Sequence, residues 1–156
     1  MWHLRSRNGE QPLGNGSRRL EFLAVLGTSR DQETVAEFAS ESKWDFTIVS
    51  TLEAAHARLH AALPAVVLLD RELLGEDWRP QVCLFARPGA EPGIAGLPAS
   101  CVILASPVMD DYLFDELIKQ GGFDLIAKPV RADELRRIGS LAVAYWKDRH
   151  RSPASG

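Results

Sequence analysis

The stretch "AVVLLDRELLGEDW", residues 65–78, contains five apolar residues that lead directly into Asp70. An apolar run of this length, rich in valine and leucine, is typical of a strand buried on both faces of a parallel sheet. A carboxylate at its end contributes nothing to the core, because a buried charge is costly unless it has a partner. The stretch therefore predicts a buried strand at 65–70 and makes Asp70 a candidate functional residue.

The rest of the chain alternates between similar apolar runs and segments with helical spacing. Further strands are expected at 21–27, 45–50, 101–106 and 124–129, and helices at 31–44, 51–63, 76–87, 110–122 and 131–149. Strict alternation predicts an α/β domain with a parallel sheet, because each crossover helix must cover one face of the sheet. The carboxyl ends of parallel strands share one edge, and ligands bind at that edge.

The composition fits a single domain with short extensions. The chain has 156 residues, of which 46% are hydrophobic and 25% charged, as in ordinary globular proteins. Residues 1–19 and 150–156 lack hydrophobic periodicity, so we expect a flexible leader and a flexible tail around a domain at 20–149. Residues 87–100 hold three prolines and three glycines and are predicted to form a loop.

Charge and cysteine content exclude several classes of function. The net charge of −3 argues against a protein that binds nucleic acid through bulk positive charge. The apolar runs are far shorter than the ~20 residues needed to cross a bilayer, and residues 1–20 have no apolar segment typical of a signal peptide. The two cysteines, Cys83 and Cys101, do not form a disulfide framework. These features predict a cytoplasmic protein without direct nucleic-acid or membrane contacts.

Three kinds of functional group follow the predicted strands. Asp70 ends the strand at 65–70, Ser106 ends the strand at 101–106, and Lys128 with Pro129 ends the strand at 124–129. In a parallel sheet, a carboxylate, a hydroxyl and an ammonium in these positions lie on the same rim. We therefore expect the three side chains to surround one small pocket.

These residues carry a resemblance to a known family. Residues 20–148 resemble the receiver domain of two-component response regulators, in "VVLLD" ending at Asp70, "VILAS" ending at Ser106, and "GGFDLIAKP" with Lys128 and Pro129. Gly75 stands where the family has a loop glycine. The resemblance implies a flavodoxin-like (βα)5 fold, a doubly wound parallel sheet of five strands in the order 2-1-3-4-5.

The resemblance also implies a chemistry. Asp70 would accept a phosphoryl group from the histidine of a sensor kinase or a phosphotransfer protein, and the domain would then change its contacts with a downstream protein target. Lys128 and Ser106 would contact the phosphoryl oxygens, and Pro129 would follow a cis peptide bond that directs the lysine. The protein would have no enzymatic activity beyond promoting its own phosphorylation. Formation of a homodimer is compatible with the resemblance.

The sequence departs from the family at the metal site. Receiver domains carry an acidic pair after the first strand, which binds Mg²⁺ together with the acceptor aspartate; here Gly27 and Thr28 stand in its place. We therefore expect at most weak Mg²⁺ binding, by Asp70 and Glu72. Asp31 and Glu33 are alternative ligands, but acids in the first turn of a helix are more simply explained by the helix dipole.

Two other functions stay open. The missing acidic pair, together with Leu125 where the family often has an aromatic residue, is compatible with a degenerate receiver that acts as an interaction module without phosphorylation. A small flavodoxin-like enzyme or cofactor carrier is the third reading. The sequence argues against it, because a glycine-rich phosphate loop and a nucleophile–base pair are both missing.

Overall fold

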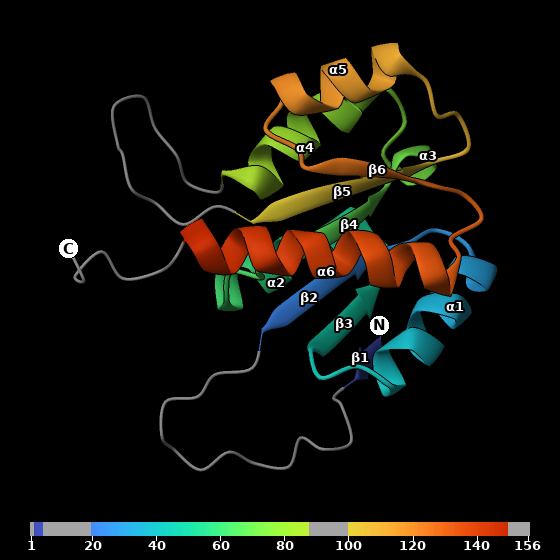
Figure 1. Cartoon of the computed structure of the whole chain (residues 1–156), viewed down its shortest axis with the longest axis vertical. Helices are drawn as coiled ribbons and strands as arrows, with labels where there is room; N and C mark the ends of the chain where they lie inside the picture. The colour runs from blue at the N-terminus through green and yellow to red at the C-terminus, as the bar shows by residue number, and fades with distance from the viewer. Residues whose placement is uncertain (1, 5–19, 88–99, 150–156) are drawn as a thin grey trace.

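The computed structural model describes residues 2–4, 20–87 and 100–149, which form one sheet with helices on both faces (Figure 1). The six strands are β1 (Trp2–Leu4), β2 (Glu21–Val25), β3 (Asp45–Val49), β4 (Val66–Asp70), β5 (Cys101–Ser106) and β6 (Asp124–Ala127). The helices are α1 (Ser29–Ser40), α2 (Leu52–Ala61), α3 (Arg71–Leu74), the 3-10 turn η1 (Gly75–Asp77), α4 (Trp78–Ala86), α5 (Asp111–Lys119) and α6 (Ala132–Arg149).

The strand order is β1-β3-β2-β4-β5-β6. The five strands from β2 to β6 are parallel. If they are numbered one to five along the chain, they lie side by side in the order 2-1-3-4-5. The flavodoxin-like fold and its strand order are therefore confirmed. The register pairs Asp70 with Ala105 and Ser106 with Ala127, so the ends of β4, β5 and β6 meet at one edge.

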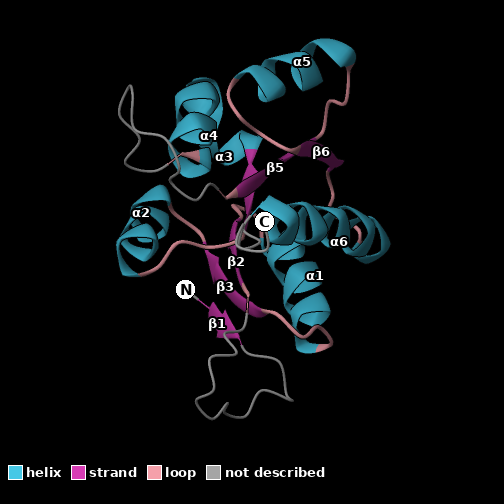
Figure 2. Cartoon of the chain, turned by 60° about the vertical axis from the view of Figure 1, so that its left-hand side comes forward, coloured by secondary structure: helices cyan, strands magenta, loops and turns pink. Residues whose placement is uncertain are grey.

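Two apolar layers lie on opposite faces of the sheet. Helices α1 and α6 cover one face, where Val35, Phe38 and Leu135 pack with Phe22 of β2. Helices α2 to α5 cover the other face, where Trp78 is among the largest buried side chains. Figure 2 shows α1 and α6 on one side of the sheet and α2 and α4 on the other. Successive strand residues alternate between these layers, which explains why the strands read as continuous apolar runs.

Residues 2–4 differ from the expected flexible leader. They form β1, which pairs antiparallel with β3, Trp2 opposite Ile48 and Leu4 opposite Phe46. The edge of β3 offers backbone groups that an extended segment can satisfy, and three residues are too few to produce a periodic sequence signal. The remaining parts of the predicted leader, loop and tail, at 5–19, 88–99 and 150–156, lie outside the described residues.

The helices differ from the expected ranges at their ends: α1 spans Ser29–Ser40 where 31–44 was expected, and α3 with η1 precede α4 where a single helix was expected. Thr28, Thr51 and Asp110 cap α1, α2 and α5 by accepting hydrogen bonds from backbone N–H groups of the first turns. Helix α5 ends at two glycines: Gly121, with a φ of +93°, adopts a left-handed conformation, and its N–H and that of Gly122 bond to the carbonyls of Ile118 and Leu117. Within the described ranges, no helix combines the length and the apolar character that a membrane crossing requires.

Candidate functional site

Asp70 lies at the junction of β4 and α3, and its side chain is 1% exposed. Its carboxylate caps α3 by accepting a hydrogen bond from the N–H of Glu72 at Oδ1, 3.0 Å away. The N–H of Gly27, which follows β2, donates to Oδ2 at 3.0 Å. Two backbone donors from neighbouring segments thus fix the position of a carboxylate that is removed from water.

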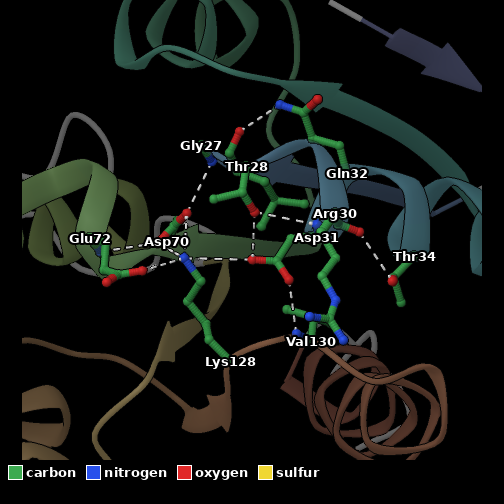
Figure 3. A network of polar contacts seen from close by, with 11 residues as sticks. Gly27, Thr28, Arg30, Asp31, Gln32, Thr34, Asp70, Glu72, Lys128 and Val130 are labelled. Carbon is green, nitrogen blue, oxygen red and sulfur yellow. Dashed lines mark hydrogen bonds and ion pairs between the residues drawn. The ribbon is translucent and has the colours of Figure 1, made fainter.

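Lys128 reaches the same carboxylate from the end of β6. Its Nζ lies 2.9 Å from Oδ1 and 3.1 Å from Oδ2 of Asp70 (Figure 3). The peptide bond between Lys128 and Pro129 is cis, as the family resemblance implied. The acid and the amine, 58 residues apart in the chain, therefore meet at the predicted edge of the sheet.

The ammonium of Lys128 is held in its charged form. Burial lowers the pKa of Lys128, but hydrogen bonds to Glu72 and then to Asp70 outweigh this effect, and the pKa is raised above the ordinary value of 10.5. The side chain is 7% exposed, so its pairing is only weakly screened by water. The lysine therefore acts as a permanent cation beside the carboxylate at neutral pH.

Glu72 closes the site from the solvent side. Its Oε1 accepts a hydrogen bond from Nζ of Lys128 at 2.7 Å, while its own side chain remains 59% exposed. It lies two residues after Asp70, in the first turn of α3. Glu72 thus joins the predicted site through the lysine.

Asp31, which the sequence offered only as an alternative metal ligand, contacts Lys128 in this site. Its side chain is 2% exposed, and Oδ2 lies 3.5 Å from Nζ of Lys128. Oδ1 accepts a hydrogen bond from the N–H of Val130 at 2.9 Å, and Oδ2 accepts one from the hydroxyl of Thr28 at 3.1 Å. In sequence, Asp31 is indistinguishable from an acid favoured by the helix dipole, since burial and the contact with Val130 appear only in three dimensions.

Ser106 lies beside this group, with its hydroxyl engaged elsewhere. The residue is fully buried, and Oγ accepts a hydrogen bond from the N–H of Val108 at 3.0 Å. Its carbonyl accepts one from the N–H of Lys128 at 3.1 Å. Ser106 therefore positions the backbone of the lysine, while its hydroxyl stabilises the turn after β5.

The remaining predicted positions have structural roles. Gly75, with a φ of +66°, ends α3 in a left-handed conformation that favours glycine. Leu125 is buried in the same apolar layer as Leu113 and Leu117 of α5. Gly27 contributes its N–H and Thr28 its capping hydroxyl, so neither position supplies a carboxylate.

The residues present do not fit a Mg²⁺ ion in this arrangement. Mg²⁺ requires near-octahedral oxygen ligands, usually from carboxylates and water. The three nearby carboxylates belong to Asp31, Asp70 and Glu72, and each has an oxygen within 3.5 Å of the Lys128 ammonium. Over the described ranges, no group of three or more His, Cys, Asp or Glu side chains is arranged to hold a metal ion.

The arrangement can support attack by a carboxylate on an electrophile. Asp70 would supply the nucleophilic oxygen, and the Lys128 ammonium lies 2.9 Å from it. A phosphoryl group has three negatively charged oxygens that need such compensation, so positioning and charge are what phosphoryl transfer demands of a protein. The N–H groups of Gly27 and Glu72 hold the carboxylate in place.

Solved structures with the same fold are receiver domains. NtrX from Brucella abortus, solved with ADP, has a TM-score of 0.69 and 20% identity over 85% of this chain and 28% of its own. The signal receiver domain of an HD domain-containing protein from Pseudomonas fluorescens has a TM-score of 0.71 and 17% identity over 91% of this chain and 100% of its own. The beryllofluoride-activated NtrC4 receiver domain dimer has a TM-score of 0.67 and 16% identity over 81% of this chain and 98% of its own.

No protein-family model and no curated protein matches the sequence. At these identities, the likeness to solved structures establishes the fold: the chain has the fold of response-regulator receiver domains, as its sequence predicted. The chain spans only 28% of the length of NtrX, so it corresponds to one part of that protein.

Proposed function

We propose that this chain is a signalling receiver domain that accepts a phosphoryl group on Asp70. The observation that supports the proposal is the contact of the Lys128 ammonium with both oxygens of the Asp70 carboxylate, at 2.9 and 3.1 Å. The donor would be the phosphohistidine of a sensor kinase or a phosphotransfer protein. The receiver fold, which the chain shares with proteins named as signal receivers, is consistent with this role.

In the proposed step, one oxygen of Asp70 attacks the phosphorus of the donor. The new O–P bond forms as the P–N bond to the histidine breaks, and the electron pair of that bond returns to the imidazole nitrogen, which takes up a proton from water. The ammonium of Lys128, which donates to the carboxylate in the resting protein, then donates to the phosphoryl oxygens. In the structure, Oγ of Ser106 accepts a hydrogen bond from the N–H of Val108. After the transfer, the hydroxyl would donate its hydrogen to the phosphoryl group.

The output would be a changed contact with another protein. Helix α5 begins at Asp111, three residues after Val108, and it carries exposed apolar side chains, among them Tyr112 at 67% exposure. Movement of the serine toward a phosphoryl group would break its bond to Val108 and release this turn. A downstream protein or a second copy of the chain are the two partners to test, and NtrC4 has a receiver domain dimer.

Intact mass measurement tests the proposal. The protein is incubated with a small acyl-phosphate donor, and we expect a phosphoryl adduct that is stable in acid and labile in base. Asp70→Asn should abolish the adduct, because the amide is a poor nucleophile. Asp77→Asn, at an exposed position in η1, is the matched control and should leave the adduct unchanged. An adduct that survives in Asp70→Asn would contradict the proposed acceptor.

A second function is favoured by the closure of the site. Each oxygen of Asp70 already accepts two hydrogen bonds, one from a backbone N–H and one from Lys128, and the carboxylate is 1% exposed. Such a closed site suits a domain that binds its partner without phosphorylation. Failure to form an adduct with either a small donor or a cognate kinase would favour this interaction module.

A further inference from the structure

Three carboxylates, one from α1 and two from the junction of β4 and α3, surround one ammonium. Nζ of Lys128 lies 2.7 Å from Glu72, 2.9 Å from Asp70 and 3.5 Å from Asp31. We refer to these four residues as the lysine cluster. Figure 3 shows the lysine entering between the carboxylates of Asp70 and Asp31, with Glu72 on the other side of Asp70. The ammonium of a single side chain therefore contacts all three carboxylates of the site.

Burial makes this arrangement dependent on its cation. The side chains of Asp31 and Asp70 are 2% and 1% exposed. Two carboxylates that are shielded from water repel one another strongly, and each loses its hydration. Without a positive charge between them, one of the two would have to be protonated or exposed. The charge balance of the site thus rests on Lys128.

Asp31 fixes the position of that cation. Its Oδ1 bonds to the N–H of Val130, two residues beyond Lys128, and its Oδ2 bonds to the hydroxyl of Thr28. One carboxylate therefore ties the start of α1 to the turn that carries the lysine. Asp31 is a positioning residue, because it acts on the site through Lys128 and the backbone around it.

We propose that Lys128 is the resident cation of this site, positioned by Asp31, and that it takes the place of a divalent metal ion. The ammonium satisfies the carboxylates that a metal ion would have to bind, so Mg²⁺ cannot enter without displacing the lysine. The proposal concerns the charge balance of the resting protein. It holds whether or not Asp70 is phosphorylated, and its test uses no phosphoryl donor.

The direct test is a titration of the natural protein with Mg²⁺, followed by amide NMR. The reporters are the N–H groups of Gly27 and Glu72, which bond to Asp70, and that of Val130, which bonds to Asp31. We expect no saturable shift of these signals at millimolar Mg²⁺. Saturable shifts of all three would show that a metal ion enters the site beside the lysine and would overturn the proposal.

A substitution then asks whether the lysine is what keeps the ion out. Lys128→Gln removes the charge, and we expect the same three signals to shift saturably with Mg²⁺. Adding Asp31→Asn to this variant should weaken the response severalfold, because one carboxylate is lost. Lys119→Gln, at an exposed lysine paired with Glu116, is the matched control and should respond like the natural protein.

The variant remains informative if it does not fold. Lys128→Gln that is unfolded in the presence of a chelator should regain its helical circular dichroism when Mg²⁺ is added, because the ion replaces the missing charge. A variant that neither binds Mg²⁺ nor refolds with it would show that the lysine does not occupy the place of a metal ion. That result overturns the proposal even if the natural protein shows no shifts.

Discussion

The carboxylate of Glu72 acts on Lys128 from the exposed side of the site. Its hydrogen bond is the largest of the effects that raise the pKa of Lys128, ahead of that of Asp70, and it opposes the lowering caused by burial. Because Glu72 is 59% exposed, water screens part of its charge. Glu72 therefore raises the pKa of Lys128, while the buried Asp70 holds the ammonium in position.

Removing the Glu72 charge should lower the pKa of Lys128. We expect Glu72→Gln to lower it only in part, because the exposed carboxylate is partly screened and the bonds to Asp70 remain. The pKa is measured from the side-chain NMR signals of the lysine in an alkaline titration. Glu76→Gln, at an exposed position in η1, should leave the titration unchanged. An equal decrease in both variants would assign the effect to overall charge.

Removing the lysine charge should cost much more stability than removing a surface charge. Lys128→Gln leaves Asp31 and Asp70 buried without their cation, and we expect a loss of about 3 kcal/mol in the free energy of unfolding without added metal. Lys119→Gln breaks an exposed pair with Glu116 and should cost far less. Urea denaturation at neutral pH measures both, and equal losses would contradict the role of the lysine cluster.

Two glycines beside the core differ in whether they leave room for a side chain. Gly122 follows the left-handed Gly121 at the end of α5, and a Cβ at this position would overlap the side chain of Leu117 and lie 3.1 Å from its carbonyl oxygen. Gly139 lies inside α6, where a Cβ would make ordinary contacts with Trp44 at 3.4 Å and Phe22 at 3.6 Å. The same substitution should therefore have opposite effects at the two sites.

We expect Gly122→Ala to destabilise the protein by roughly 1–3 kcal/mol, because Leu117 is part of the core and must shift. Gly139→Ala should stabilise it by up to about 1 kcal/mol, because alanine is the better helix former and the space is available. Thermal unfolding followed by circular dichroism compares the two variants. A stabilising Gly122→Ala would show that the end of α5 adjusts more freely than the structure indicates.

Across the whole domain, the stability at alkaline pH follows from two buried groups. Burial raises the pKa of the Cys101 thiol from 9.0 to about 11, and the pKa of Lys128 is raised above 10.5. In both cases the folded protein holds its proton at a pH where the unfolded chain has released it. The free energy of unfolding should therefore fall as the pH rises, first above 9.0 for the thiol and then above 10.5 for the ammonium.

The thiol contribution can be isolated with one variant. Between pH 9.0 and 11 the natural protein should lose roughly 2 kcal/mol through Cys101, and Cys101→Ala should remove this part of the slope. Cys83→Ala is the matched control, because Cys83 is exposed on α4, and it should keep the slope. Urea denaturation over this pH range measures the slopes; identical slopes in all three proteins would contradict the buried thiol.

Most of the fold could be predicted because local sequence patterns determine its helices and strands. The apolar runs, capping residues and helix-terminal glycines each occupy a few consecutive positions, and the topology of a parallel sheet then places Asp70 and Lys128 at one edge. The role of Asp31 beside Lys128 and the strand β1 could not be predicted in this way. The first depends on a hydrogen bond between residues 99 positions apart, and the second on a pairing with a distant strand edge.

The hydroxyl of Ser106 is an intermediate case. Its place at the end of β5 was predicted, but the sequence gives no sign that its Oγ bonds to the N–H of Val108. A serine followed by a proline within a turn can bond locally or reach across a pocket, and both choices leave the same sequence pattern.

The antiparallel β1 also affects how copies of the molecule meet. An uncovered outer strand exposes unpaired backbone groups that can recruit another chain and begin aggregation. In the described sheet, β1 covers the outer side of β3. A chain shortened to begin at Leu20 would lose that cover, and we expect it to self-associate more readily in sedimentation experiments while its five parallel strands persist. Three residues near the start of the chain would then serve chiefly to keep the molecules apart.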